Sequence, residues 1–139
     1  MINPEVDFSF NMAKVPELPL VYRGVWKIPG GLSYFAGHFP GNPILPAVGL
    51  QDGSLEAVKR ILKAQSLPSD LEFHSLRSAK FTQSITSGDE VELTATETLV
   101  QSPQGQSSRW RVEWKLLPER KVAADLIFEV RSRSQVSHQ

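Results

Sequence analysis

Residues 34–57 read YFAGHFPGNPILPAVGLQDGSLEA and hold one histidine, three prolines spaced three apart and then an acidic residue. The prolines are Pro40, Pro43 and Pro46. Because a proline fixes its own φ and biases the preceding residue toward extended backbone, the path from His38 to Pro46 has few conformations. We therefore expect a rigid connector that holds the His38 side chain at a fixed distance from the element that follows.

That element is predicted to be a helix of about five turns over residues 46–65. Pro46 suits the first helical position. Apolar residues recur along the segment at helical spacing, at Leu50, Leu55, Val58 and Leu62. Three cations, Lys59, Arg60 and Lys63, lie toward its C-terminal end, where the helix dipole favours positive charge.

The rest of the chain predicts strands. A first strand is expected over residues 19–30, and GGLSYF at residues 30–35 is consistent with a single helical turn. Further strands are expected over residues 71–85, 90–100, 109–117 and 122–130, separated by a turn at 87–89, a hairpin loop at 101–108 and a turn at 118–121. The alternating pattern places these side chains on the core face: Val91, Leu93, Ala95, Leu99, Trp110, Val112, Trp114 and Leu116.

One long helix among antiparallel strands predicts an α+β fold in which a strongly curved sheet covers a central helix. We expect a single domain over residues 18–131. Residues 1–17 carry few apolar residues and no clear period, so we expect an arm or a loosely packed lead-in there. The polar tail over residues 132–139 is expected to be disordered.

The composition excludes several function classes. The 139 residues hold 15 basic and 15 acidic side chains, and this balance argues against a nucleic-acid binder. The absence of cysteine excludes disulfides, thiolate zinc sites and a cysteine nucleophile. No segment has the roughly 20 apolar residues of a membrane span, and no signal peptide is visible. We expect a cytoplasmic protein that has no metal or cofactor.

The motif GHFPGNPILPAV followed by Asp52 resembles the signature of the β-hydroxyacyl-acyl-carrier-protein dehydratases, which have the hotdog fold and include an aryl-polyene-cluster type. In that family an acidic residue stands fourteen positions after the histidine, as Asp52 does after His38. Residues 77–93 are similar to the family's later strand–turn–strand. The likeness runs from about residue 20 to residue 131.

The resemblance implies removal of water from 3-hydroxyacyl groups on acyl carrier protein, in fatty-acid or aryl-polyene-type synthesis. Such a reaction needs a base for a C2 proton and an acid for the leaving hydroxyl. The resemblance assigns these roles to His38 and Asp52, in a dimer where His38 of one subunit faces Asp52 of the other. It places the substrate against the backbone N–H of Ala47, with Val48 behind it. The remaining residues that it assigns are Gly37 and Phe39 against the substrate, and Pro40, Pro46 and Glu56 in support.

Two departures from the family pattern leave alternatives open. Ala47 stands where the family has glycine, and Glu56 stands where it has glutamine. We expect Glu56 to pair with Lys59 or Arg60 at helical spacing, and the alternative is that its charge acts on Asp52. At the level of function, the alternatives are a non-catalytic hotdog subunit that binds acyl thioesters or a partner dehydratase, and a hotdog thioesterase.

Other polar residues are expected to be structural or solvated rather than functional. His74 falls within a predicted strand and His138 within the tail. Arg77, Lys80 and the basic residues at 59–63 are candidates for contact with an acidic carrier protein, but an ordinary charged surface is the preferred interpretation.

Overall fold

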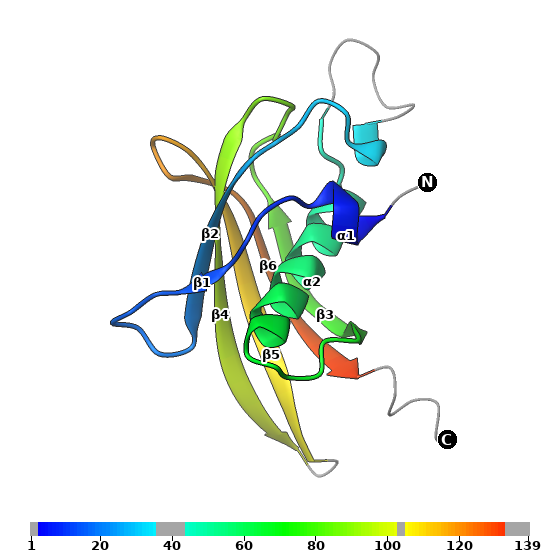
Figure 1. The fold of residues 1–139 in the computed structure, drawn as a ribbon, viewed down its shortest axis with the longest axis vertical. Coiled ribbons are helices and arrows are strands. Elements are labelled where there is room, and N and C mark those ends of the chain that lie inside the picture. The colour runs from blue at the N-terminus through cyan, green and yellow to red at the C-terminus, as the bar shows by residue number, and fades with distance from the viewer. Residues whose placement is uncertain (1–2, 36–43, 103–104, 133–139) are drawn as a thin grey trace.

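The chain forms a curved antiparallel sheet that wraps around one long helix (Figure 1). The computed structural model describes residues 3–35, 44–102 and 105–132. The helices are α1 (Pro4–Asp7), the 3-10 turn η1 (Ser33–Phe35) and α2 (Ala47–Ala64). The strands are β1 (Ala13–Lys14), β2 (Val21–Lys27), β3 (Leu71–Phe81), β4 (Glu90–Ser102), β5 (Gly105–Leu116) and β6 (Lys121–Ser132).

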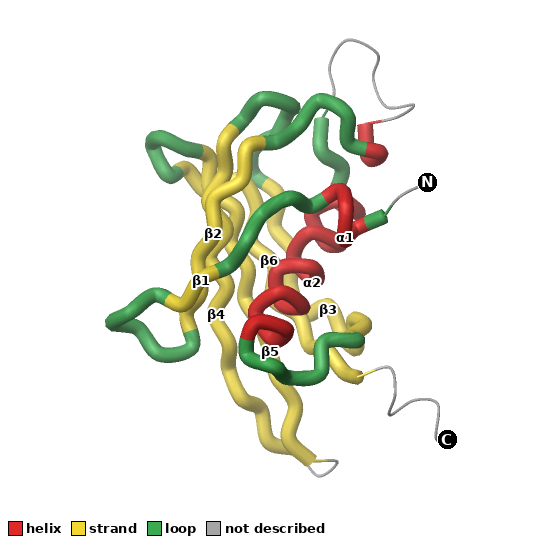
Figure 2. Tube along the Cα trace, viewed as in Figure 1, coloured by secondary structure: helices red, strands yellow, loops and turns green. Residues whose placement is uncertain are grey.

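The sheet has the order β1-β2-β4-β5-β6-β3, and every neighbouring pair is antiparallel. Figure 2 shows α2 lying against the concave face of this sheet. The α+β prediction is therefore confirmed, and the helix expected over residues 46–65 is α2. None of the helices in the described part of the chain has the length and apolar character of a membrane span.

The hairpin between β4 and β5 differs from the prediction. The two strands pair as far as Ser102 and Gly105, so residues 101–108 are mostly strand rather than loop. Leu99 was expected in the core, but it is 54% exposed. The reason is visible in Figure 1, where the end of this hairpin extends beyond the region that α2 covers.

Gly53 and Ser54 of α2 make a tight contact with Trp114 of the sheet. A Cβ on Gly53 would lie 2.7 Å from Cη2 of Trp114 and 2.8 Å from Cε1 of Phe8. The indole Nε1 of Trp114 donates to Oγ of Ser54 at 2.9 Å, and that hydroxyl donates to the carbonyl of Leu50 at 2.7 Å. Trp114 of β5 and Ser54 are fully buried, so this contact fixes both the depth and the rotation of α2.

The N-terminal segment packs into the core, and the expectation of a loosely packed arm is wrong for the residues around Phe8. Phe8, Phe10 and Met12 are all buried. The Phe8 ring lies 5.4 Å from that of Trp26, and Trp26 donates through Nε1 to Ser9 at 3.1 Å. Burial of these large side chains makes the segment part of the domain. Residues 133–139 of the expected tail lie outside the described residues.

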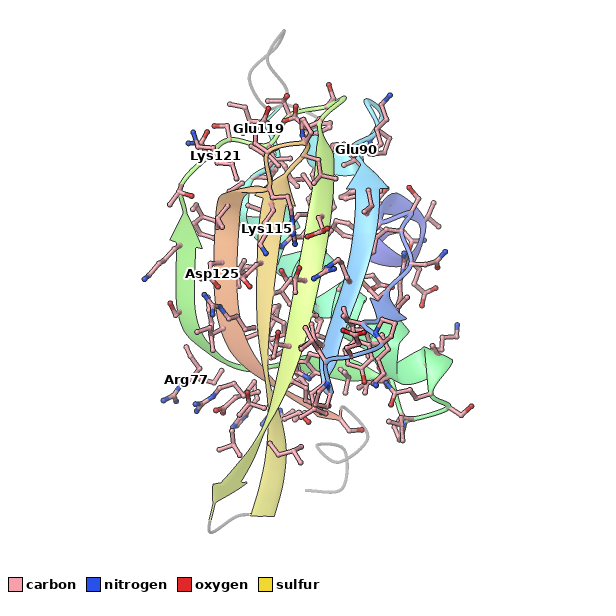
Figure 3. All side chains as sticks on the ribbon, turned by 90° about the vertical axis from the view of Figure 1, so that its left-hand side faces the viewer. Arg77, Glu90, Lys115, Glu119, Lys121 and Asp125 are labelled. Carbon is pink, nitrogen blue, oxygen red and sulfur yellow. The ribbon has the colours of Figure 1, made fainter. Side chains whose placement is uncertain are left out.

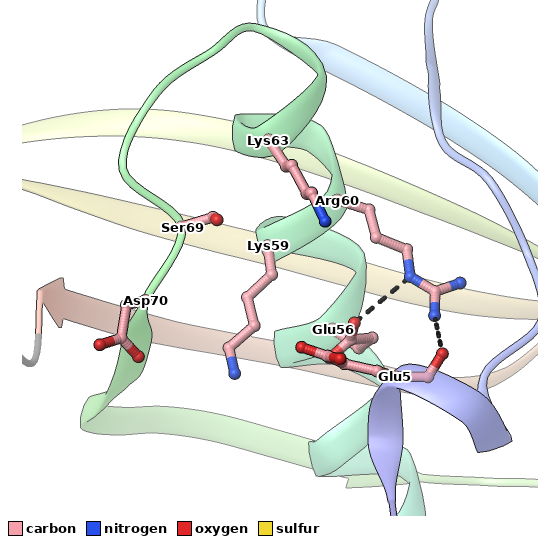
Figure 4. Close-up of a pocket in the computed structure, with 7 residues that line it drawn as sticks. All are labelled: Glu5, Glu56, Lys59, Arg60, Lys63, Ser69 and Asp70. Atoms are coloured by element: carbon pink, nitrogen blue, oxygen red, sulfur yellow. Dashed lines mark hydrogen bonds and ion pairs between the residues drawn. The ribbon is translucent and has the colours of Figure 1, made fainter.

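Arg60 of α2 fastens this N-terminal segment to the helix (Figure 4). Its guanidinium donates to Oε1 of Glu56 at 3.3 Å, to the carbonyl of Glu5 at 3.1 Å and to the carbonyl of Phe10. The guanidinium carbon also lies 5.0 Å from the centre of the Phe10 ring. Glu56 is only 5% exposed, so its carboxylate needs a partner inside the protein. The ion pair with Arg60 supplies that partner. The predicted pairing of Glu56 with a cation four residues away is confirmed for Arg60.

The outer face of the sheet carries cross-strand ion pairs. Figure 3 looks onto this face, where Lys115 and Asp125 project from neighbouring strands. Arg109 bonds Glu129 at 2.8 Å, and Arg111 bonds Asp125 at 2.8 Å. The bond from Arg109, aided by the charges of Arg109, Arg77 and His74, holds the pKa of Glu129 below its usual value. These two ion pairs join β5 to β6 across the outer face.

We expect Gly53→Ala to destabilise the fold, because the added methyl meets two rigid rings. Overpacking of this kind costs about 1–3 kcal/mol, which outweighs a gain of up to about 1 kcal/mol in helix propensity. Urea unfolding followed by circular dichroism measures the change. Gly31→Ala is the matched control, since a Cβ there meets nothing within 4 Å. A Gly53→Ala protein as stable as Gly31→Ala would contradict the tight contact with Trp114.

We expect Arg60→Met to lower the free energy of unfolding by about 2 kcal/mol or more, because it leaves the buried Glu56 carboxylate without its cation. Methionine keeps the apolar stem over Phe10. Lys63→Met, an exposed change on the same helix, is the control and should cost little. Adding Glu56→Gln to Arg60→Met should recover part of the loss. Equal stability of Arg60→Met and Lys63→Met would show that Arg60 does not fasten the N-terminal segment.

Candidate active site

The first turn of α2 begins at Ala47 with no side chain capping it. Pro46 precedes it in extended conformation, at φ −76° and ψ 165°. The approach to the helix is held by the sheet-like bridge between Ile44 and Thr86 and by a bond from the Leu45 N–H to the Ile85 carbonyl at 2.7 Å. The N–H groups of a first helical turn have no partner within the helix and carry the positive end of its dipole. This end of α2 is therefore suited to bind a polarised oxygen.

A groove of about 380 Å³ lies beside this helix end. One side of the groove is the start of α2 and the segment before it, and the other is the end of β3 and the residues that follow. Phe81, which closes β3, is 44% exposed. The lining residues are mainly apolar or uncharged: Ile44, Leu45, Pro46, Ala47, Leu50, Phe81, Thr82, Gln83 and Ser84. An acyl group is a suitable occupant for such a surface.

Asp52 lies on the second turn of α2 and is half-buried. Its carboxyl oxygen Oδ2 accepts a hydrogen bond of 2.7 Å from the hydroxyl of Tyr34. Val48, four residues earlier, shares the same face of the helix and is 52% exposed. The Asp52 carboxyl is therefore held on its inner side by Tyr34 and sits on a helix face that solvent reaches.

Tyr34 is fixed by its surroundings as well as by this bond. It belongs to η1, where the single helical turn was expected, and is only 3% exposed. Its ring lies 5.5 Å from that of Phe8, and Gly49 of α2 leaves room for it, since a Cβ there would lie 3.3 Å from Cδ1 of the ring. Burial raises the pKa of Tyr34 well above its ordinary value, and the hydrogen bond to Asp52 and the charges of Asp52, Asp7 and Glu56 add to the rise. The phenol therefore stays neutral and acts as a donor.

The structure places only some of the predicted site residues. Pro46, Ala47, Val48, Asp52 and Glu56 lie on or beside the first half of α2. The remaining predicted residues, Gly37, His38, Phe39 and Pro40, fall within residues 36–43 and so lie outside the described residues. The structure thus gives no distance between His38 and Asp52. The predicted roles of all these residues stay predictions.

Tyr34 is the site residue that the sequence reasoning missed. The Tyr34–Asp52 bond joins residues 18 positions apart, and no motif or helical spacing connects them. The available signal was an aromatic residue with a polar group in the turn just before the proline-rich connector. A buried tyrosine usually finds a hydrogen-bond partner for its hydroxyl.

Within the described ranges, no group of three histidine, aspartate or glutamate side chains is placed to hold a metal ion. A polar pocket of about 410 Å³ lies further along α2, lined by Glu5, Glu56, Lys59, Arg60, Lys63, Ser69 and Asp70. It contains both signs of charge, including the Glu56–Arg60 pair that Figure 4 shows. That mixture favours neither an anion nor a cation.

Solved structures with this fold come from several bacteria. A chain of the dehydratase heterocomplex ApeI:P from Xenorhabdus doucetiae matches with a TM-score of 0.60 and 18% identity, over 84% of this chain and 91% of that one. The PaaI protein of the Escherichia coli phenylacetic acid degradation operon matches with a TM-score of 0.64 and 11% identity, over 89% and 83% of the chains. At these identities the likeness shows the fold alone, and it confirms the expected hotdog fold.

The sequence comparisons identify the family. The chain is 31% identical over 75 residues to the 3-hydroxyacyl-acyl-carrier-protein dehydratase FabZ of Granulibacter bethesdensis, which is 50% of this chain and 44% of that protein. The match thus spans less than half the length of that relative. The ApeI-like family pattern, described as ApeI dehydratase, matches residues 22–113. Since this match covers more than half of the chain, the protein belongs to the ApeI-like dehydratase family.

Proposed function

We propose that the protein removes water from 3-hydroxyacyl thioesters carried on acyl carrier protein and releases trans-2-enoyl thioesters, in fatty-acid or aryl-polyene-type synthesis. The observation that carries the proposal is the place of Asp52. Its half-buried carboxyl is held by Tyr34 on the second turn of α2. The uncapped start of the same helix borders the uncharged groove, which Asp52 itself does not line. The similarity to FabZ of Granulibacter bethesdensis, an acyl-carrier-protein dehydratase, supports the same substrate class.

In the proposed reaction His38 removes a proton from C2, and the electron pair of that C–H bond forms the C2–C3 double bond. The C3–O bond breaks, and the leaving hydroxyl takes a proton from Asp52 to become water. Negative charge that develops on the thioester oxygen is stabilised by the N–H of Ala47, with Val48 behind it. An alanine at position 47 still donates this N–H, so the departure from glycine does not remove the group.

The second departure from the family pattern, Glu56, has a structural explanation. Glu56 is bonded to Arg60, and Arg60 bonds the carbonyls of Glu5 and Phe10. The charge at this position therefore helps to hold Arg60, which attaches the N-terminal segment to α2. We propose that Glu56 supports the site by holding α2 and the residues around Phe8 together.

We also propose that the working unit contains two chains. In the described part of the molecule, β3 has a neighbour in the sheet on one side only, β6, so the backbone groups of its other edge are open over an 11-residue strand. Leu76 and Phe81 on this strand are 46% and 44% exposed. A second copy paired along β3 would satisfy the edge and cover these side chains. Such a pairing is compatible with His38 of one subunit acting with Asp52 of its partner.

A second candidate is a non-catalytic subunit that assists a partner dehydratase. The observation in its favour is that the ApeI-like solved structure is described as a heterocomplex. A thioesterase is the third alternative. The product separates these functions: an enoyl thioester absorbs in the ultraviolet, a thioesterase releases a free thiol, and a non-catalytic subunit forms neither when it is assayed alone.

We expect His38→Ala and Asp52→Asn each to lower kcat for a 3-hydroxyacyl-acyl-carrier-protein substrate by about 10²–10⁴-fold, the usual contribution of a general acid or base. Enoyl absorbance gives the rate, and circular dichroism checks the fold. His138→Ala, which changes a histidine of the polar C-terminal sequence, is the matched control and should keep the wild-type rate. Dehydration at the wild-type rate by His38→Ala would rule out the assigned base. The same result for Asp52→Asn would rule out the assigned acid.

A further inference from the structure

We infer that Tyr34 is a positioning residue for the Asp52 carboxyl, which fixes the oxygen that gives up the proton. The inference rests on the proposed dehydration. The Tyr34 hydroxyl donates to Oδ2 of Asp52 at 2.7 Å, the usual length of an O–H···O hydrogen bond. Tyr34 thus engages one of the two oxygens and leaves Oδ1 for the substrate.

The bond determines where the acid proton sits. A carboxylic acid has one protonated oxygen and one carbonyl oxygen, and the carbonyl oxygen is the better acceptor. Because Tyr34 always offers a proton to Oδ2, that oxygen serves as the carbonyl and Oδ1 carries the proton. The carboxyl plane is held at the same time, so the proton points in one direction when the substrate arrives.

The same bond strengthens during the reaction. As Oδ1 gives its proton to the leaving hydroxyl, the carboxyl becomes an anion, and a hydrogen bond to an anion is stronger than one to a neutral acid. The bond therefore stabilises the transition state more than the ground state, which is the condition for faster chemistry. Tyr34 itself moves no proton, because burial, followed by the hydrogen bond to Asp52 and the acidic groups nearby, raises the pKa of Tyr34 well above its ordinary value.

The packing around Tyr34 allows its hydroxyl to be removed by substitution while the contacts of the ring are kept. The ring packs against Phe8 of the N-terminal segment and beside Gly49 of α2, and phenylalanine would keep both contacts. The charged groups that act on Tyr34 are Asp52 and Glu56 of α2 and Asp7 of α1, and Glu56 is paired with Arg60. All of them remain in a Tyr34→Phe protein, so any difference reports the lost hydroxyl.

The kinetic test compares Tyr34→Phe with Tyr22→Phe. Tyr22 is also buried, and its hydroxyl accepts a bond from Gln65 at 3.1 Å near the other end of α2. We expect Tyr34→Phe to lower kcat about 10-fold or more, with little change in KM, since it removes a hydrogen bond to a charged group. Tyr22→Phe should keep the wild-type kcat and KM.

A second readout does not need activity. The carboxyl carbon of Asp52 can be identified in the ¹³C spectrum by its loss in Asp52→Asn, and its chemical shift can be compared among the proteins at one pH. In Tyr34→Phe this resonance should move, because the carboxyl loses the hydrogen bond at Oδ2, and in Tyr22→Phe it should stay. An unmoved resonance in Tyr34→Phe, or a kcat equal to that of Tyr22→Phe, would overturn the inference. A wild-type protein that turns over no 3-hydroxyacyl thioester would instead contradict the proposed function, and the carbon shift would still decide whether Tyr34 bonds Asp52.

Discussion

The indole of Trp114 packs directly against Gly53 of α2 and donates a hydrogen bond to the hydroxyl of Ser54. This contact sets the rotation of α2 and therefore the position of the candidate site. Successive residues of a helix are separated by about 100° around its axis. Since Gly53 and Ser54 face the sheet, Asp52 is turned toward the flank of the helix, where it is half-buried. A side chain larger than hydrogen at residue 53 would push the helix away from β5 and move Asp52 relative to the turn that holds Tyr34.

The two acidic residues of α2 one turn apart have partners of different chemistry. Asp52 accepts from a neutral phenol, whereas Glu56 is bonded to a guanidinium. The guanidinium that bonds Glu56 also bonds the carbonyls of Glu5 and Phe10, so Glu56 is part of the attachment of the N-terminal segment. Asp52 has no such cation and lies half-buried on a helix face that solvent reaches. This contrast supports the proposed division of roles between catalysis at Asp52 and support at Glu56.

Much of the fold could be predicted because its signals are local. The apolar spacing of α2 and the alternation around Trp110, Val112 and Trp114 are properties of short segments, and these three side chains are fully buried, as expected. The hairpin at 101–108 was misjudged because its polar, glycine-containing sequence is typical of a loop, although its backbone groups pair. Phe8, Phe10 and Met12 alternate, but three residues are too short a run to separate a buried strand-like segment from a lead-in.

The candidate site was harder to predict, since it depends on contacts between distant segments. Asp52 was found through its spacing from His38 within the resemblance, and Glu56 through helical spacing to Arg60. The bond between Tyr34 and Asp52 appears only when η1 is brought against α2, a result of the packing of Phe8 and Gly49. No pattern within either segment contains that information.

The central claim is that one chain supplies His38 and its partner supplies Asp52, and a mixed dimer tests it most directly. His38→Ala and Asp52→Asn chains with different tags can be produced together and the mixed dimer isolated. In that dimer one of the two sites has both residues intact, so we expect about half of the wild-type dehydration rate, although each variant alone is slower than wild type by about 10²–10⁴-fold. A mixed dimer no more active than its two parents, or the absence of any dimer, would contradict a site shared between two copies of this chain.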